Sequence, residues 1–311
     1  MNGVVIVDKP KGMTSHDVVA RVRRATRIKK VGHAGTLDPD ATGVLVVLVG
    51  KATRLAQFFV ELEKRYRGRV VLGSSTDTQD ASGVVVSTGD TSDISPERIR
   101  EVFAEFEGEG EQVPPMVSAL KRDGTPLYVL ARRGEVVERK ARPIFVSDMR
   151  VVGIEMPEVE FELACSRGTY VRTIAADIGE RLGCGGHLGD LTRMAVGHFD
   201  LESAVGLDEV DRAGPNGPLP GFSMLDALSF MPELRVTEAE EDAISTGGAI
   251  EVESERVVPS GEFVRITRDG EELAAVGKLV ESEGEESETS DGASLPRRRR
   301  IRPVRVFIEP F

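Results

Sequence analysis

Apolar residues recur along the first part of the chain in two periods, which together predict short strands mixed with helices. Continuous apolar runs of strand length occupy Gly3–Val7 and Val44–Val49. The apolar positions within residues 18–22 repeat with helical spacing, and we expect Ser15 to cap the start of that helix. Thr53–Leu62 also follows the helical period, with its apolar residues on one face.

The middle of the chain continues this mixture. Ser95 and Pro96 predict a helix start, because proline is well tolerated at the first helical position. The other expected elements are strands at Arg65–Gly73, Arg142–Val152 and Val159–Cys165, and helices at Pro126–Arg133 and Tyr170–Leu182. Strict strand–helix–strand alternation is missing. The pattern favours an α+β fold, with a mixed, largely antiparallel sheet and flanking helices.

The chain changes character after about residue 230. Short apolar runs then lie between turn residues, at Ile250–Val252, Phe263–Thr267, Leu273–Leu279 and Ile301–Ile308. A Glu-, Ser- and Gly-rich stretch near 281–294 is too polar to pack, and we expect it to be a disordered acidic insertion. We therefore predict two domains, at residues 1–230 and 231–311, of which the second is small and β-rich.

The distribution of charge along the chain indicates what kind of partner the protein binds. The net charge of −12 taken alone argues against a nucleic-acid binder. However, Lys and Arg dominate residues 1–76, Asp and Glu dominate residues 238–291, and the end of the chain is again basic over Arg297–Arg305. Local basic segments of this kind are typical of proteins that bind a polyanion. Charges that simply solvate a surface are the alternative interpretation.

Two further features bear on the cellular compartment. No apolar run approaches the roughly 18 residues of a membrane span, and the N-terminus has no signal-peptide layout. Cys165 and Cys184 form no metal-ligand spacing and no disulfide framework, so we expect both as reduced core residues. The simplest expectation is a cytoplasmic protein that does not enter a membrane.

The densest candidate chemistry lies in the loop Gly32–Gly43, which contains an imidazole, two carboxylates and two hydroxyls. Asp38 is the best candidate for a nucleophile or base, and the following proline restricts it to extended conformations. Two alternatives remain open: Asp38 caps its own turn, or it forms a metal-binding pair with Asp40. A phosphate-binding loop is excluded at Gly50–Ala52, where the required glycine and hydroxyl spacing is missing.

Two other segments are candidates of lower specificity. Cys165–Thr173 predicts a strand end, a glycine turn and a helix start, with Arg172 in the first helical turn. A cation is unfavourable there for the helix dipole, so we expect it to have a carboxylate partner. The polar turn Thr76–Gly83 follows the strand that carries Tyr66, inside a basic cluster with Lys64 and its neighbouring arginines. A surface arginine and an ordinary turn are the alternatives for these two segments.

Taken together, these segments resemble the catalytic signature of the TruB-type tRNA pseudouridine synthases, bacterial stand-alone enzymes that isomerise uridine 55 in the T loop of tRNA. The resemblance covers about residues 1–200, in the order of the family. The segments that carry it are Val7–Gly12, Gly32–Gly43, Lys64–Tyr66, Thr76–Asp80, Val113–Lys121 and Cys165–Thr173. The C-terminal part resembles a PUA domain, an RNA-binding β-barrel, from which the acidic insertion departs.

The resemblance implies a role for each matching residue. It assigns catalysis to Asp38 as the nucleophile, to Tyr66 as the residue that stacks on the uracil and accepts the C5 proton, and to Arg172 as the partner of Asp38. We expect this pairing to offset desolvation and keep the Asp38 carboxylate ionised. The implied substrate-binding residues are His33, which takes the place of the flipped base, Lys9, which shapes the cleft floor, and Lys64, Asp80, Gly32 and Thr36.

The resemblance further implies that the reaction needs no metal, nucleotide or redox cofactor. The implied partner is the T arm of tRNA, with no obligatory protein partner and a monomeric enzyme. Two routes stay open for the first step: attack on C1′ of the ribose, or removal of the C2′ proton to give a glycal. Two alternative functions also stay open, a non-catalytic RNA-binding or RNA-chaperone protein of the same fold and a guide-RNA-dependent synthase of the dyskerin type.

Overall fold

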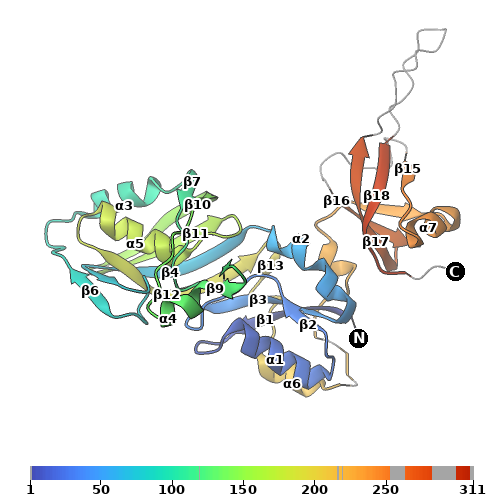
Figure 1. The fold of residues 1–311 in the computed structure, drawn as a ribbon, viewed down its shortest axis with the longest axis horizontal. Coiled ribbons are helices and arrows are strands. Elements are labelled where there is room, and N and C mark those ends of the chain that lie inside the picture. Colours follow the sequence, from blue (N-terminus) through green and yellow to red (C-terminus); the bar gives the residue numbers. More distant parts are fainter. Residues whose placement is uncertain are drawn as a thin grey trace, which may run out of the picture.

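The computed structural model describes residues 2–118, 120–215, 217–218, 220–252, 263–281 and 299–308 (Figure 1). Its larger part is a sheet of nine strands whose main order is β1-β3-β12-β4-β11-β10-β7. The bounds are β1 (Gly3–Lys9), β3 (Thr42–Val49), β12 (Gly186–Val196), β4 (Lys64–Leu72), β11 (Glu158–Cys165), β10 (Arg142–Glu155) and β7 (Gly108–Gln112). Two short strands complete it, β2 (Val31–His33) beside β3 and β13 (Phe199–Asp200) beside β12.

The pairing confirms the predicted α+β class and the largely antiparallel sheet. Among the described strands of this sheet, only β3 and β12 run parallel, meeting at Thr42 with Thr192 and at Gly43 with Arg193. This pair matters for function because it joins the end of the Gly32–Gly43 loop to the middle of the sheet. Strand β12 was missed from the sequence, as was β7.

Helix α1 (Ser15–Thr26) buries Val18, Val19 and Val22, as their spacing predicted. Its N-cap is Thr14, so the prediction of Ser15 was wrong. The Thr14 hydroxyl accepts a hydrogen bond from the Asp17 amide, and the Asp17 carboxylate accepts one from the Thr14 amide, a capping box. The predicted helix Thr53–Leu62 is a 3-10 turn, η1 (Gly50–Leu55), followed by the short helix α2 (Ala56–Val60).

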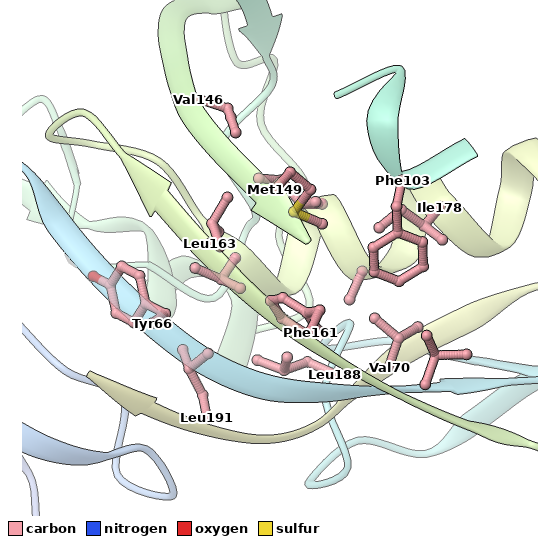
Figure 2. Packing of buried hydrophobic residues seen from close by; sticks show 14 of the residues in the cluster. Tyr66, Val70, Phe103, Val146, Met149, Phe161, Leu163, Ile178, Leu188 and Leu191 are labelled. Atoms are coloured by element: carbon pink, nitrogen blue, oxygen red, sulfur yellow. The ribbon is translucent and has the colours of Figure 1, made fainter. Parts of the chain in front are cut away.

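Helices α3 (Pro96–Ala104) and α5 (Val171–Arg181) lie over the end of the sheet that contains β10 and β11 (Figure 1). Between helices and sheet lies a core in which Phe103 from α3 packs against Phe161 from β11, with ring centroids 6.1 Å apart. Figure 2 shows Tyr66 in the same cluster, near Leu163 and Leu191 and away from the α3 side. The apolar core thus extends to the residue that the sequence placed in the active site.

The remaining elements of the larger part are short. Helix α6 (Leu207–Ala213) packs beside α1 and shares its apolar cluster. Two separate two-stranded sheets accompany the main sheet: the first pairs β5 (Ser74–Thr76) with β6 (Val85–Thr88), and the second pairs β8 (Lys121–Arg122) with β9 (Thr125–Pro126). The short helix α4 (Leu127–Arg132) follows β9 directly. In the described part of the chain, no helix is long and apolar enough to span a membrane.

The C-terminal part is a five-stranded sheet in the order β14-β16-β17-β18-β15, with helix α7 (Glu238–Ser245) packed against it (Figure 1). The strands are β14 (Glu233–Val236), β15 (Ile250–Val252), β16 (Phe263–Arg268), β17 (Glu272–Glu281) and β18 (Arg299–Val306). Phe263 packs edge-on against Phe58 of α2, with centroids 5.2 Å apart. The domain boundary at residues 230 and 231 stays a prediction. The disordered insertion predicted near 281–294 lies outside the described residues, apart from Glu281 itself.

Candidate active site

The Gly32–Gly43 loop connects β2 to β3 and is held in place by buried polar groups from the N-terminal segment. The Ser15 hydroxyl accepts a hydrogen bond from the Leu37 amide at 2.9 Å and donates one to the Leu37 carbonyl at 3.1 Å. The Lys9 amine donates to the carbonyl oxygens of Pro10, Met13 and Pro39, at 3.0, 2.6 and 3.0 Å. The backbone on both sides of Asp38 is therefore fixed before any substrate binds.

The geometry fits the expected place of Lys9 at the floor of the cleft. The expected contact with carbonyl groups is present, but the side chain is 0% exposed, so its amine cannot reach an RNA phosphate. Burial lowers the pKa of Lys9 to about 8, against the opposing influence of Asp40 and Asp38. This position fits support of the loop backbone at the floor of the site.

Asp38 meets Arg172, as predicted, and Asp80 joins them. The Arg172 guanidinium lies 3.5 Å from an Asp38 carboxylate oxygen and 3.4 Å from an Asp80 carboxylate oxygen. It also donates to the Val117 carbonyl at 2.6 Å. Its side chain is only 4% exposed, whereas that of Asp38 is 44% exposed. The buried arginine therefore presents one partly open carboxylate to the solvent side.

The two carboxylates have opposite pKa shifts. For Asp80, burial raises the pKa, but hydrogen bonds from the Ser82 and Thr78 side chains and from the Ser82 amide outweigh it, and the pKa is lowered. For Asp38, burial raises the pKa and outweighs the opposing charge of Arg172. The predicted offset is therefore incomplete. Both carboxylates face Arg172, and Asp38 is the more basic of the two.

The surroundings of Asp80 link it to the site through Arg172. Its carboxylate is engaged by Arg172, Thr78 and Ser82 within the protein, and its predicted contact with the RNA loop stays a prediction. The turn Thr76–Gly83 therefore has a defined task in positioning Arg172.

Tyr66 lies on the inner face of β4, next to the apolar core, and is 9% exposed. The alternation of β4 puts Arg65, Arg67 and Arg69 on the opposite, outer face, where Arg67 pairs with Glu160 at 2.7 Å and Arg69 pairs with Glu158 at 2.7 Å. The expected basic cluster around Tyr66 is therefore wrong. Burial raises the pKa of the Tyr66 phenol, and Arg193 opposes that shift by its charge and by a hydrogen bond.

Lys64 is also on the inner face, 5% exposed, and its amine donates to the Val60 and Leu62 carbonyls at the end of α2. Burial lowers the pKa of Lys64 to about 8. The predicted RNA contact of Lys64 does not fit this position, because its amine is enclosed and its hydrogen bonds are made within the protein.

His33, Gly32 and Thr36 lie on the same loop. His33 is partly buried, and its Nδ1 atom has no hydrogen-bond partner among the described residues. Burial lowers the pKa of His33, with smaller contributions from Arg193 and His16, so the imidazole is neutral. Thr36 is exposed, and Gly32 has no neighbour closer than 3.9 Å to the place of a Cβ. Their predicted roles in substrate binding stay predictions.

The described residues contain no group of three or more His, Cys, Asp or Glu side chains arranged to hold a metal ion. Asp40 in particular is exposed and forms no ion pair with another described residue. Cys165 and Cys184 are both free and buried, as predicted.

The comparison with known families decides how this arrangement is to be understood. Residues 23–171 match the family described as TruB family pseudouridylate synthase (N terminal domain), and residues 172–215 match the tRNA pseudouridylate synthase B C-terminal domain. The chain belongs to the TruB family. The Asp38, Tyr66 and Arg172 positions all lie inside these matched segments, together with the rest of the loop Gly32–Gly43.

Individual relatives extend the TruB match over most of the chain. A tRNA pseudouridine synthase B of Geobacter sulfurreducens is 46% identical over 287 residues, which is 90% of this chain and 94% of that protein. The protein of the same name from Syntrophotalea carbinolica is 50% identical over 237 residues, 76% of this chain and 78% of that protein.

Solved structures confirm the fold. A chain in the crystal structure of a Cbf5-Nop10-Gar1 complex aligns with a TM-score of 0.71 and 27% identity, covering 99% of this chain and 85% of that chain. A second, in the structure of an H/ACA RNP bound to a substrate RNA containing 2′-deoxyuridine, has a TM-score of 0.70 and 25% identity, with coverages of 99% and 86%. The predicted pseudouridine-synthase fold with a small PUA-like β domain at the C-terminus is thereby confirmed.

Two residues of this TruB-family site were missed from the sequence. Ser15 was assigned to a helix cap, although its hydroxyl holds the Leu37 backbone. Arg193 was not singled out, although it is 1% exposed and lies between the loop and Tyr66. A lone serine or arginine in the sequence carries no signal for either position, since both act through backbone atoms far away in the chain.

Proposed function

We propose that this chain is a tRNA pseudouridine synthase that isomerises uridine 55 in the T loop to pseudouridine, with Asp38 as the reacting carboxylate. The observation that carries the proposal is the ion-pair group in which the buried Arg172 is shared between Asp80 and the partly open Asp38. A carboxylate kept ionised beside a cation, yet of raised basicity, suits a nucleophile or a base at neutral pH.

The chemistry follows from what pseudouridine formation requires. The target uridine leaves the stack and meets Asp38, and leaving the stack costs a few kcal/mol. The Asp38 carboxylate then either attacks C1′ or removes the C2′ proton, and in both routes the C1′–N1 electron pair leaves with the uracil. The uracil turns so that C5 faces C1′, and a C1′–C5 bond forms. In the first route the Asp38–C1′ ester bond breaks at this point, and in the second route C2′ takes its proton back from Asp38. The C5 proton is then lost to a base, and N1 gains a proton.

Tyr66 is the residue that we propose for the uracil face and for the C5 proton. It lies inside the core, where its ring gives an apolar platform next to Asp38, whose charge acts on its phenol. Because burial raises the pKa of Tyr66, the resting phenol is neutral and can accept the C5 proton only after giving up its own. Arg193 is the contact that favours this loss, by stabilising the phenolate.

His33 supports extrusion of the base in this proposal. A neutral, planar imidazole at the edge of the loop can stack where the uridine has left, which recovers part of the lost stacking energy. Its lowered pKa makes a cationic contact with phosphate unimportant.

The proposed partner is tRNA, which would contact exposed basic residues before α1, in its last turn and after it. These residues are Lys11, Arg24, Arg27, Lys29 and Lys30, and none of them is ion-paired to another described residue. At the C-terminus, Arg300 pairs with Glu251, and Arg305 donates to the Gln57 side chain, so these two arginines are already engaged. We further propose cytoplasmic action as a monomer, without a guide RNA or a protein partner.

The experiment uses a tRNA transcript labelled with [5-³H]uridine and the full chain alone. Isomerisation replaces the C5–H bond by C5–C1′, so release of tritium into water measures the reaction directly. Release from bare transcript, and its loss when uridine 55 is replaced by cytidine, are the expected results. No release from a folded, tRNA-binding protein would favour the non-catalytic alternative. Release that requires a guide RNA would favour the dyskerin-type alternative.

A further inference from the structure

Arg193 is the largest side chain that is fully buried in the described part of the protein, and it lies on β12 beneath the active-site loop. Its Nε atom donates to the Val44 carbonyl at 2.7 Å, and Nη2 donates to the Gly35 carbonyl at 3.1 Å. These carbonyls lie on either side of residues 36–43. One guanidinium therefore ties together both ends of the segment that contains Asp38.

The same guanidinium reaches the second functional side chain. Tyr66 on β4 is the direct partner of Arg193 in the antiparallel register of β4 and β12. Paired residues of neighbouring strands point to the same face, so the Arg193 and Tyr66 side chains lie side by side, and Arg193 opposes the rise in the pKa of the Tyr66 phenol. Arg193 is thus in contact with the Asp38 loop and with Tyr66 at once.

The backbone of Arg193 fixes the loop as well. Gly43, the last residue of the loop, pairs with Arg193 in the parallel register of β3 and β12. A Cβ atom at Gly43 would lie 2.3 Å from the Arg193 carbonyl oxygen, and the φ of Gly43 is +96°. Only glycine permits this approach without a shift of the backbone. The close approach sets the height of the loop above β12.

Burying the charge of Arg193 in this position is unfavourable in free energy. No carboxylate of the described residues lies within ion-pair distance of it, and its charge lowers the pKa of three buried neighbours, Lys9, His33 and Lys64. An enclosed cation whose described hydrogen-bond partners are neutral carbonyls carries a desolvation penalty that no opposite charge offsets. A purely structural bridge between two strands does not need a charge of this kind.

We propose that Arg193 is a positioning residue for the isomerisation, which sets the Asp38 loop against the Tyr66 hydroxyl and holds that oxygen toward the uracil site. The proposal rests on the proposed function, since it assigns Arg193 a task within that reaction. Loss of the Arg193 guanidinium removes the hydrogen bonds to the Gly35 and Val44 carbonyls and the neighbour of the Tyr66 phenol together. A displacement of about 1 Å of a reacting group lowers a rate by roughly 100-fold.

The test compares Arg193→Gln and Arg193→Lys with the matched control Lys64→Met. The control removes another enclosed cation from the same region, but one whose amine contacts only the end of α2. Single-turnover rates and tRNA dissociation constants are measured at a temperature at which each variant is folded. The second readout is the ¹³Cζ NMR signal of tyrosine, which reports hydrogen bonding of the phenol. The chain has three tyrosines, and Tyr66→Phe assigns the signal.

The proposal expects Arg193→Gln to lower the single-turnover rate by roughly 100-fold, with a tRNA dissociation constant within about threefold of wild type and a displaced Tyr66 signal. Arg193→Lys keeps the positive charge but loses the two-pronged guanidinium that bonds both carbonyls, so an intermediate rate is expected. This variant decides the test if Arg193→Gln does not fold. Lys64→Met should leave the Tyr66 signal in place.

Two results would overturn the assignment: a rate within threefold of wild type in the Arg193 variants, or an unmoved Tyr66 signal. An inactive wild-type protein would instead refute the proposed function. In that case the NMR signal still tests the contact between Arg193 and Tyr66.

Discussion

Replacing Lys9 by methionine separates support of the active-site loop from contact with RNA. Methionine has nearly the same length, but it cannot donate to the Pro10, Met13 and Pro39 carbonyls. The Pro39 carbonyl directly follows Asp38, so the change frees the backbone next to the reacting carboxylate. Every other feature of the basic N-terminal segment is kept.

The expected loss of stability follows from the contacts. A hydrogen bond to a charged donor contributes about 1.5–3 kcal/mol, and a buried acceptor left without a partner costs about 1–3 kcal/mol. Because methionine also removes the desolvation cost of a buried ammonium group, several kcal/mol are returned. The net change is a decrease of about 2–4 kcal/mol in the free energy of unfolding. At about 2–4 °C per kcal/mol, the melting temperature falls by about 5–15 °C.

The assay combines urea unfolding, single-turnover tritium release and tRNA binding, with Lys11→Met as the matched control. Lys11 is the exposed lysine two residues later. Lys9→Met should lose stability and turnover while its tRNA affinity stays within about threefold of wild type, because a fully buried amine contacts no phosphate. Lys11→Met should keep stability and turnover. Weaker tRNA binding by Lys9→Met at unchanged turnover and stability would refute the reasoning.

Three further predictions concern protonation, stacking and charge. As pH falls through the raised pKa of Asp38, the ionised carboxylate is lost and the rate should fall with it. Because Arg172 lowers that pKa, Arg172→Met should raise it and move the acid limb of the pH–rate profile to higher pH. An acid limb at the wild-type pH would contradict this. His33→Phe should retain more single-turnover activity than His33→Ala, and equal losses count against stacking. The plot of log affinity for tRNA against log salt should be steep, and replacing Lys29 and Lys30 by glutamine should reduce its slope by about 1.5, as fluorescence titrations can check; an unchanged slope excludes both residues from phosphate contact.

Local patterns predicted the elements well where burial alternates cleanly, and less well where distant contacts decide. Helix α1 has two hydroxyl residues in succession, and its cap is Thr14 because Ser15 is used by the Leu37 backbone. Strand β12 was missed because it contains two glycines and several polar residues and is interrupted by bulges against β4. Its pattern becomes a strand only when β3 and β4 lie on both sides.

The candidate site was predicted in part for the same reason. The Asp38 and Arg172 pairing follows from the family resemblance and from the need of a helix-start cation for a carboxylate. The family resemblance implied substrate binding for Lys64 and a place at the cleft floor for Lys9. The amines of both residues are enclosed by backbone carbonyl groups. Every residue has a carbonyl group, so the sequence does not indicate which of them a lysine will contact. Arg193 escaped notice because its described partners, Gly35, Val44 and Tyr66, are more than a hundred residues away in the chain.

The most direct test of the central claim is single-turnover tritium release from [5-³H]uridine-labelled tRNA by wild type and Asp38→Asn, with tRNA binding measured on the same preparations. Asparagine keeps the size of the side chain but removes the charge that Arg172 faces. The account predicts release by the wild type, no detectable release by Asp38→Asn, and tRNA binding by both. Release by Asp38→Asn within tenfold of the wild-type rate would contradict the assignment of Asp38 as the reacting carboxylate.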